Sequence, residues 1–195
     1  MTISRGPMSS VPDKRQKKLI LDFSLKRISE NQFFQEYPSS REKIGSLTQS
    51  MLWDALNQKD ADGVSFGVLL MYHFGITKDF LEVLKILAEE PWHQTHEDIV
   101  FALGKLKDPS SIEILSRTAV AVHPYLDIDE AFALGTKSIY ALEKIQTPEA
   151  IQKLGDLAKS ENEILRKAAI TCLKYIMEKG ETETLRAAAA AFLNA

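Results

Sequence analysis

The stretch VHPYLDIDEAF, residues 122–132, holds the densest group of side chains in this sequence that could take part in chemistry. His123 precedes three acids, Asp127, Asp129 and Glu130. Imidazole and carboxylate groups bind metals, but these residues match neither a zinc ligand spacing nor the ligand series of a calcium loop. Carboxylates near a helix start cap its free N–H groups and favour the positive end of its dipole. The pattern favours helix capping over metal binding, with partner contact as the alternative.

Two further places could carry chemistry, and each has a simpler structural explanation. His93 and His96 are three residues apart, but no third ligand is near them in the sequence, so we predict no metal site. Cys172 lies on the apolar side of its helix without a cationic or histidine neighbour, which predicts a small buried core residue. The sequence shows no nucleophile–base pair and no pair of acids fixed by a motif. We therefore predict that the protein is not an enzyme and has no cofactor.

The composition limits the class of protein. The chain has 195 residues, an apolar fraction of 45% and a net charge of −3, so no overall positive field attracts it to nucleic acid or to anionic lipid. No apolar run approaches the length of a membrane span, and the first residues lack the hydrophobic core of a signal peptide. A single cysteine excludes an intramolecular disulfide and is typical of a reducing compartment. We expect a cytoplasmic protein without membrane contact.

Helical patterns cover nearly everything after a flexible lead, which we place at residues 1–12. Apolar residues recur at three- and four-residue spacing, and glycine and proline are few. Ser29 with Gln32, and Ser39 with Glu42, fit the capping box that starts a helix. In residues 13–76, which we interpret as degenerate repeats or an N-terminal cap, the expected helices span residues 14–26, 29–37, 39–57 and 63–73.

A repeated helix–turn–helix unit begins at Thr77. Three first helices align, ITKDFLEVLKILA, DPSSIEILSRTA and TPEAIQKLGDLA, and each is followed by a second helix with a leucine at an equivalent position. Proline at a first helical position explains why new units start at Asp108-Pro109 and Thr147-Pro148, because its missing N–H group is not needed there. The aligned anchors are Leu81, Ile112 and Ile151 in the first helices, and Leu103, Leu142 and Leu173 in the second helices.

The segments FALGKLKDPSSIEIL and YALEKIQTPEAIQKL resemble HEAT repeats, especially the short bacterial HEAT-like repeats known from phycobilisome lyases. The resemblance covers about Thr77 to Gly180, and residues 181–195 would form a C-terminal cap. It implies an all-α fold in which residues 77–195 form a right-handed α-solenoid of helical hairpins. The repeated positions record packing and say little about activity.

The stretch VHPYLDIDEAF is an insertion into the middle repeat. The spacing between anchors is 22 residues from Leu81 to Leu103 but 30 residues from Ile112 to Leu142. The eight extra residues fall at the turn between the paired helices, and insertions of this kind often belong to a binding surface. We expect Tyr125 or His123 to be accessible to solvent there, and we predict that Tyr125, Asp127 and Asp129 contact a partner.

The second helices place aromatic and basic residues at repeated positions opposite the buried leucines. Aromatic side chains beside lysines are typical of protein interfaces. Alternatively, the insertion or a terminal helix covers Phe101 and makes it part of the core. The predicted partner-binding residues in these helices are Phe101, Lys105, Lys137, Tyr140, Lys144, Thr171 and Tyr175.

We interpret the chain as a non-enzymatic module that binds another protein through the concave face of its repeats. Its size and acidity resemble those of HEAT-like immunity proteins that neutralise bacterial toxins, so a toxin is one expected partner. The alternative is a DNA-binding HEAT-like protein of the DNA glycosylase type, although the net charge argues against nucleic acid. A chromophore lyase is a third possibility, for which no ligand motif is present. In the DNA-binding alternative, the local basic groove would be formed by Lys105, Lys137, Lys144, Lys167 and Lys174.

Overall fold

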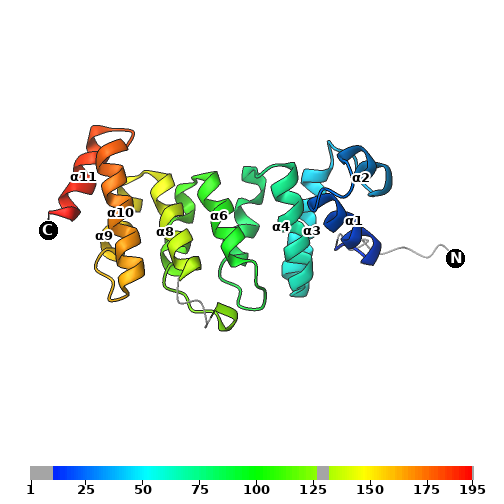
Figure 1. Cartoon of the computed structure of the whole chain (residues 1–195), viewed down its shortest axis with the longest axis horizontal. Helices are drawn as coiled ribbons and strands as arrows, with labels where there is room; N and C mark the ends of the chain where they lie inside the picture. The colour runs from blue at the N-terminus through cyan, green and yellow to red at the C-terminus, as the bar shows by residue number, and fades with distance from the viewer. Residues whose placement is uncertain (1–10, 127–131, 195) are drawn as a thin grey trace. The chain divides into compact units, whose positions relative to one another are not determined.

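The structure is a computed structural model, which describes residues 11–126 and 132–194 (Figure 1). Regular structure in these residues is entirely helical, with eleven α-helices, three short 3-10 helices and no strand. The predicted all-α class is confirmed. Of the predicted flexible lead, residues 1–10 lie outside the described part of the chain.

The helices follow one another closely along the sequence. The α-helices are α1 (Lys14–Ser24), α2 (Glu30–Glu36), α3 (Ile44–Gln58), α4 (Ala61–Phe74), α5 (Leu81–Leu87), α6 (His96–Leu106), α7 (Ile112–Thr118), α8 (Ala133–Ile145), α9 (Pro148–Leu157), α10 (Glu163–Lys179) and α11 (Glu183–Leu193). The 3-10 helices are η1 (Lys78–Phe80), η2 (Pro109–Ser111) and η3 (Pro124–Leu126).

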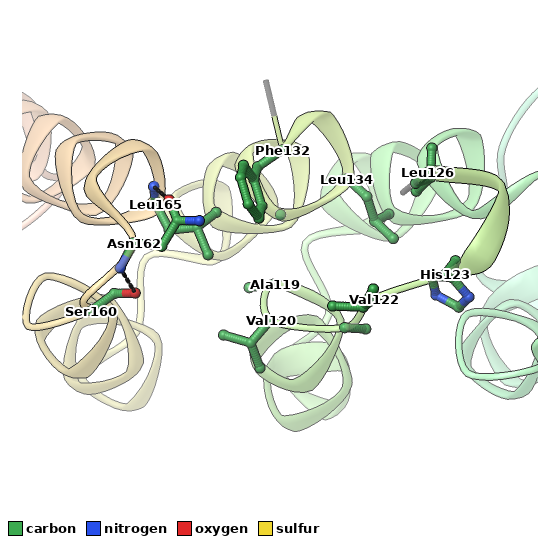
Figure 2. Close-up of a pocket in the computed structure, with 12 residues that line it drawn as sticks. Ala119, Val120, Val122, His123, Leu126, Phe132, Leu134, Ser160, Asn162 and Leu165 are labelled. Atoms are coloured by element: carbon green, nitrogen blue, oxygen red, sulfur yellow. Dashed lines mark hydrogen bonds between the residues drawn. The ribbon is translucent and has the colours of Figure 1, made fainter. Parts of the chain in front are cut away.

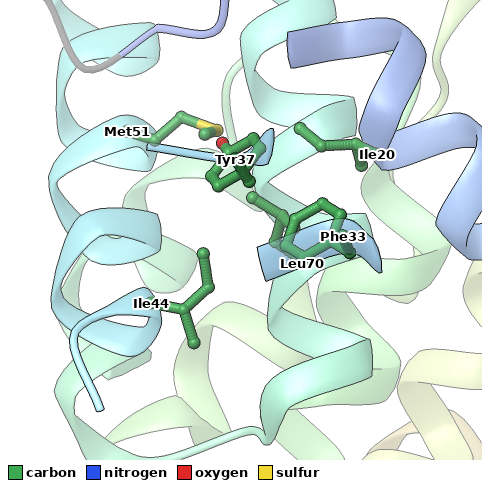
Figure 3. Packing of buried hydrophobic residues seen from close by; sticks show 6 residues of the cluster. All are labelled: Ile20, Phe33, Tyr37, Ile44, Met51 and Leu70. Carbon is green, nitrogen blue, oxygen red and sulfur yellow. The ribbon is translucent and has the colours of Figure 1, made fainter. Parts of the chain in front are cut away.

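The chain divides into two compact units. The first contains the described residues up to Val83 together with Trp92–Thr95. Helices α1 to α4 supply its core, in which the Phe33 ring stacks on the rings of Tyr37 and Phe23. Figure 3 shows the buried cluster at this core, formed by Ile20, Phe33, Tyr37, Ile44, Met51 and Leu70.

Capping residues set the helix starts in the first unit, with one correction to the prediction. The capping box of Ser29 and Gln32 is present at α2, as predicted. The box predicted at Ser39 and Glu42 is wrong, because α3 begins only at Ile44 and has no side-chain cap. The Ser39 hydroxyl donates instead to a neighbouring backbone carbonyl, so it does not cap a helix.

The second unit contains Leu84–Pro91 and the described residues from His96 onward. Helix α8 packs against α6, α7, α9 and α10, while α11 packs against α9 and α10. Figure 1 shows α6, α8 and α10 following one another along this unit. The repeated second-helix anchors Leu103, Leu142 and Leu173 are fully buried, so they form the interior side of these three helices.

Prolines open two of the repeats, as predicted. Pro148 opens α9, and the Thr147 hydroxyl accepts a hydrogen bond from the Ala150 N–H group. Pro109 opens the 3-10 helix η2, which leads directly into α7.

The connection between α7 and α8, residues 119–132, is longer than the connection between α9 and α10, residues 158–162. The predicted lengthening of this turn is confirmed. Asp127 and Asp129 lie outside the described residues. The prediction that they cap a helix therefore falls on residues that the structure does not describe. The N-cap position of α8 is occupied by Phe132, which makes no side-chain capping hydrogen bond.

Candidate partner-binding surface

Helices α6, α8 and α10 each expose the side that lies opposite their buried leucine. One residue turns a helix by about 100°, so positions two before and two after that leucine lie about 160° from it. These positions hold side chains that the sequence assigned to partner binding. They are Phe101 and Lys105 in α6, Tyr140 and Lys144 in α8, and Thr171 and Tyr175 in α10; with Lys137 of α8, we call them the aromatic–lysine face.

The three aromatic side chains of this face are exposed. The exposed fractions are 39% for Phe101, 43% for Tyr140 and 52% for Tyr175. Buried aromatic residues dominate a protein core, so three aromatic rings at exposed repeat positions need another reason.

The structure brings Phe101, Lys105 and Lys144 together. The Lys105 ammonium lies 5.4 Å from the centroid of the Phe101 ring, and the Lys144 ammonium lies 5.0 Å from it. Both distances are within the range of a cation–π interaction. Lys105 shares a helix with Phe101, whereas Lys144 reaches it from α8. We call these three residues the Phe101 cluster.

A glycine allows the two helices to come this close. A Cβ atom added at Gly104 would lie 2.8 Å from the Cβ atom of Ala141, nearer than two such atoms can approach. The Lys144 side chain passes beside the same position. Gly104 therefore sets the separation of α6 and α8 at which Lys144 meets Phe101.

Two lysines on or near this face are paired within the protein. Lys137 forms an ion pair with Glu97 of α6, and Lys167 forms one with Glu163 one turn earlier in α10. The Thr171 hydroxyl donates to the backbone carbonyl of Lys167 at 2.8 Å, so its proton is already used within the helix. Thr171 can offer a partner only an acceptor.

Tyr125 of the insertion has a partner inside the protein. Its hydroxyl lies 2.9 Å from Nδ1 of His96, which is fully buried in the first turn of α6. The other ring nitrogen, Nε2, lies 2.8 Å from the backbone carbonyl of Glu90. A carbonyl can only accept, so Nε2 carries the proton and, in the neutral ring, Nδ1 accepts from Tyr125.

His123 is buried, so of the two residues of which one was expected to reach solvent, Tyr125 or His123, only Tyr125 is partly accessible. The exposed fraction of His123 is 6%, and its ring centroid lies 3.8 Å from that of His96. Burial lowers the pKa of His123, because the charged ring loses hydration there. Within the described residues, its Nε2 atom has no hydrogen-bond partner. Tyr125 is half-buried, and together His96, His123 and Tyr125 form what we call the histidine cluster.

The insertion also borders an apolar cavity of about 380 Å³ (Figure 2). Val122 and Leu126 line it from the insertion, and Leu165 lines it from α10. Phe132 lies at its edge in a left-handed backbone conformation with φ 49°, which a residue with a bulky side chain seldom adopts.

Sequence reasoning found the aromatic–lysine face but missed the histidine cluster and the cavity. The repeat spacing predicted this face, because equivalent positions of the second helices recur in the alignment. No local spacing links His96 to residues of the insertion almost thirty positions later. The apolar run AVAV, residues 119–122, was an available indication of an apolar surface there.

The other candidate residues have structural roles. Cys172 is buried as predicted, and burial raises the pKa of its thiol to about 12, so the nucleophilic thiolate does not form near neutral pH. His93 is also buried, and its Nδ1 atom accepts from the Thr95 N–H group. No three His, Cys, Asp or Glu side chains of residues 11–126 and 132–194 converge as metal ligands.

No protein-family model matches the chain, and no curated protein matches it. Among the helices of the described residues, none combines the length and the apolar character that a membrane span requires. A function can therefore be inferred only from the chemistry of the aromatic–lysine face and its surroundings.

Proposed function

We propose that the second unit is a non-enzymatic protein-binding module that recognises its partner through the aromatic–lysine face. We infer further that its hairpins stack as a right-handed α-solenoid of the HEAT-like type, in which second helices such as α6, α8 and α10 line the concave surface. The buried leucine in each of these helices supports this arrangement. The repeated units that the sequence assigns to residues 77–195 are the basis for it.

The observation that carries the proposal is the exposure of Phe101, Tyr140 and Tyr175 at equivalent positions of α6, α8 and α10. Large aromatic side chains contribute most to protein interfaces, because they bury much area and lose little conformational entropy. Flanking lysines guide association and contribute less to affinity. Aromatic anchors with a charged surround are typical of an interface rather than of a solvated helix surface.

The proposed absence of an enzymatic role is supported by the engagement of the reactive groups within the fold. The Cys172 thiol is buried with a raised pKa, and both ring nitrogens of His96 have hydrogen-bond partners. The HEAT-like immunity proteins that the chain resembles make a bacterial toxin the first partner class to test. A cytoplasmic location is part of the same proposal.

DNA binding of the glycosylase type is the second candidate. The lysines beside Phe101 and Tyr140 favour it, because aromatic stacking and backbone charge together bind single-stranded nucleic acid. The net charge of −3 and the pairing of Lys137 and Lys167 with carboxylates work against it.

The test uses the intact chain as bait in a lysate, with identification of what it retains. The double variant Phe101→Ala/Tyr140→Ala should weaken the complex with the identified partner by about 1–4 kcal/mol. Leu25→Ala, which changes an exposed apolar residue of the first unit, should leave the affinity unchanged. Equal retention of the partner by the parent and the double variant would contradict the proposed surface. Salt-sensitive retention of DNA alone would favour the second candidate.

A further inference from the structure

The Phe101 cluster concentrates positive charge on a chain whose net charge is −3. Both ammonium groups lie close to the centroid of one ring, so they are no more than about 10.4 Å apart whichever side of the ring each takes. The two ammonium groups therefore add their positive potentials at one place on the surface. An anion bound beside them would be attracted by both.

The neighbouring lysines differ from Lys105 and Lys144 in their pairing. Lys137 and Lys167 have carboxylate partners within the protein. In the described part of the chain, neither Lys105 nor Lys144 forms an ion pair with a carboxylate. Lys144 does lower the pKa of Glu143, but burial outweighs this effect and raises the pKa of that carboxyl overall. The cations beside Phe101 therefore remain available to an external anion.

We propose that the Phe101 cluster receives a carboxylate side chain from an acidic segment of the protein partner. The two ammonium groups would hold the carboxylate by charge-assisted hydrogen bonds, which are stronger than neutral ones. The Phe101 ring would pack against the methylene groups of the acidic side chain or against an apolar neighbour in the segment. This inference rests on the proposed protein-binding function and adds the chemistry of the partner.

An acidic polypeptide fits this surface better than nucleic acid. A protein that binds nucleic acid tightly contacts a run of phosphates, commonly about 6–10. Among the lysines of α6, α8 and α10, only Lys105, Lys144, Lys174 and Lys179 have no ion pair with a described residue. Lys137 and Lys167 already bind the carboxylates of Glu97 and Glu163, so they are not available to a continuous phosphate backbone. An isolated carboxylate needs only the local pair of cations.

The test is a fluorescence-anisotropy titration of the full chain with three labelled probes. The first is a short glutamate-rich peptide with one phenylalanine, the second replaces each glutamate by lysine, and the third is a short oligothymidylate. The parent should bind the acidic peptide, with an affinity that falls as salt rises, and should bind the basic peptide at least about 10-fold more weakly.

Lysine variants then locate the site. Lys105→Ala/Lys144→Ala should weaken binding of the acidic peptide by about 10-fold or more and reduce its salt dependence. The matched control Lys159→Ala/Lys167→Ala removes the same number of charges from exposed positions of the same unit outside the aromatic–lysine face, and should change binding by less than about 2-fold. All four lysines are on the surface, and circular dichroism verifies that each variant is folded.

Three outcomes would overturn the carboxylate site. They are equal losses in the two lysine variants, tighter binding of oligothymidylate than of the acidic peptide, and no binding of the acidic peptide at about millimolar protein, the weak end of specific association. Its failure is distinguishable from that of the proposed function. If Phe101→Ala/Tyr140→Ala loses the identified partner while Lys105→Ala/Lys144→Ala retains it, the carboxylate site is wrong and the protein-binding function stands.

Discussion

The connection between α7 and α8 and the aromatic–lysine face hold their aromatic side chains in opposite ways. In the connection, the Tyr125 hydroxyl is bonded to buried His96, and the His123 ring lies against the same histidine. On the face, Tyr140 is exposed and its hydroxyl makes no hydrogen bond with a described residue. An insertion at a turn can thus be fixed by contacts with buried residues, whereas side chains in the middle of regular helices can remain exposed for a partner to bind.

The largest effect should come from removing the centre of the histidine cluster. His96→Ala takes away the donor to the Glu90 carbonyl, the acceptor for Tyr125 and the ring that packs against His123. We expect the free energy of unfolding to fall by about 2–4 kcal/mol, measured by urea denaturation. If the two units unfold in separate steps, the step of the second unit should move. A loss below about 1 kcal/mol would show that the connection is not tied to the core.

A pair of tyrosine variants compares the two regions directly. Tyr125→Phe removes one hydroxyl that is bonded to His96, and should lower the free energy of unfolding by about 0.5–1.5 kcal/mol. Tyr140→Phe removes an exposed hydroxyl and should have almost no effect. Both variants are measured by the same urea titrations. Equal changes in the free energy of unfolding would contradict the proposed difference between the two regions.

The pH dependence of stability should come from the connection and not from the face. Burial lowers the pKa of His123 below its ordinary value of 6.5, so the folded protein binds a proton at this site less readily than the unfolded chain. The contribution to stability is therefore complete above about pH 6.5 and is lost as the pH falls through the lowered pKa. His123→Phe keeps an aromatic ring and should flatten this dependence in melts between about pH 7.5 and pH 5. An unchanged slope in the variant would show that other groups dominate.

The smallest effect on stability should come from the face itself. Phe101→Ala and Tyr140→Ala should each lower the free energy of unfolding by less than about 1 kcal/mol, because both rings are already exposed. Truncation of a core aromatic residue costs roughly 3–5 kcal/mol. Thermal melts distinguish the two cases without a partner. Melting far below the parent would place these rings in the core and remove the basis of the proposed surface.

Local sequence patterns accounted for most of the helical structure. The Ser29 capping box, the start of α9 at Pro148 and the buried leucines of the second helices were all predictable, because each depends on residues within one or two helical turns. The box at Ser39 failed because the same residue types can bond to nearby backbone without starting a helix. A capping motif therefore predicts a helix start only where its side chains have no other hydrogen-bond partner nearby.

The sequence by itself determined which residues of α6, α8 and α10 point away from the core, since helical periodicity and the repeated leucines are sufficient for that. Only the tertiary structure decided which lysines are paired, because Lys137 meets Glu97, and Lys144 meets Phe101, across the gap between α6 and α8. That gap depends on the close approach at Gly104. The burial of His123 against His96 was likewise decided by packing, since periodicity relates positions along one helix and not the distance between a helix and a distant turn.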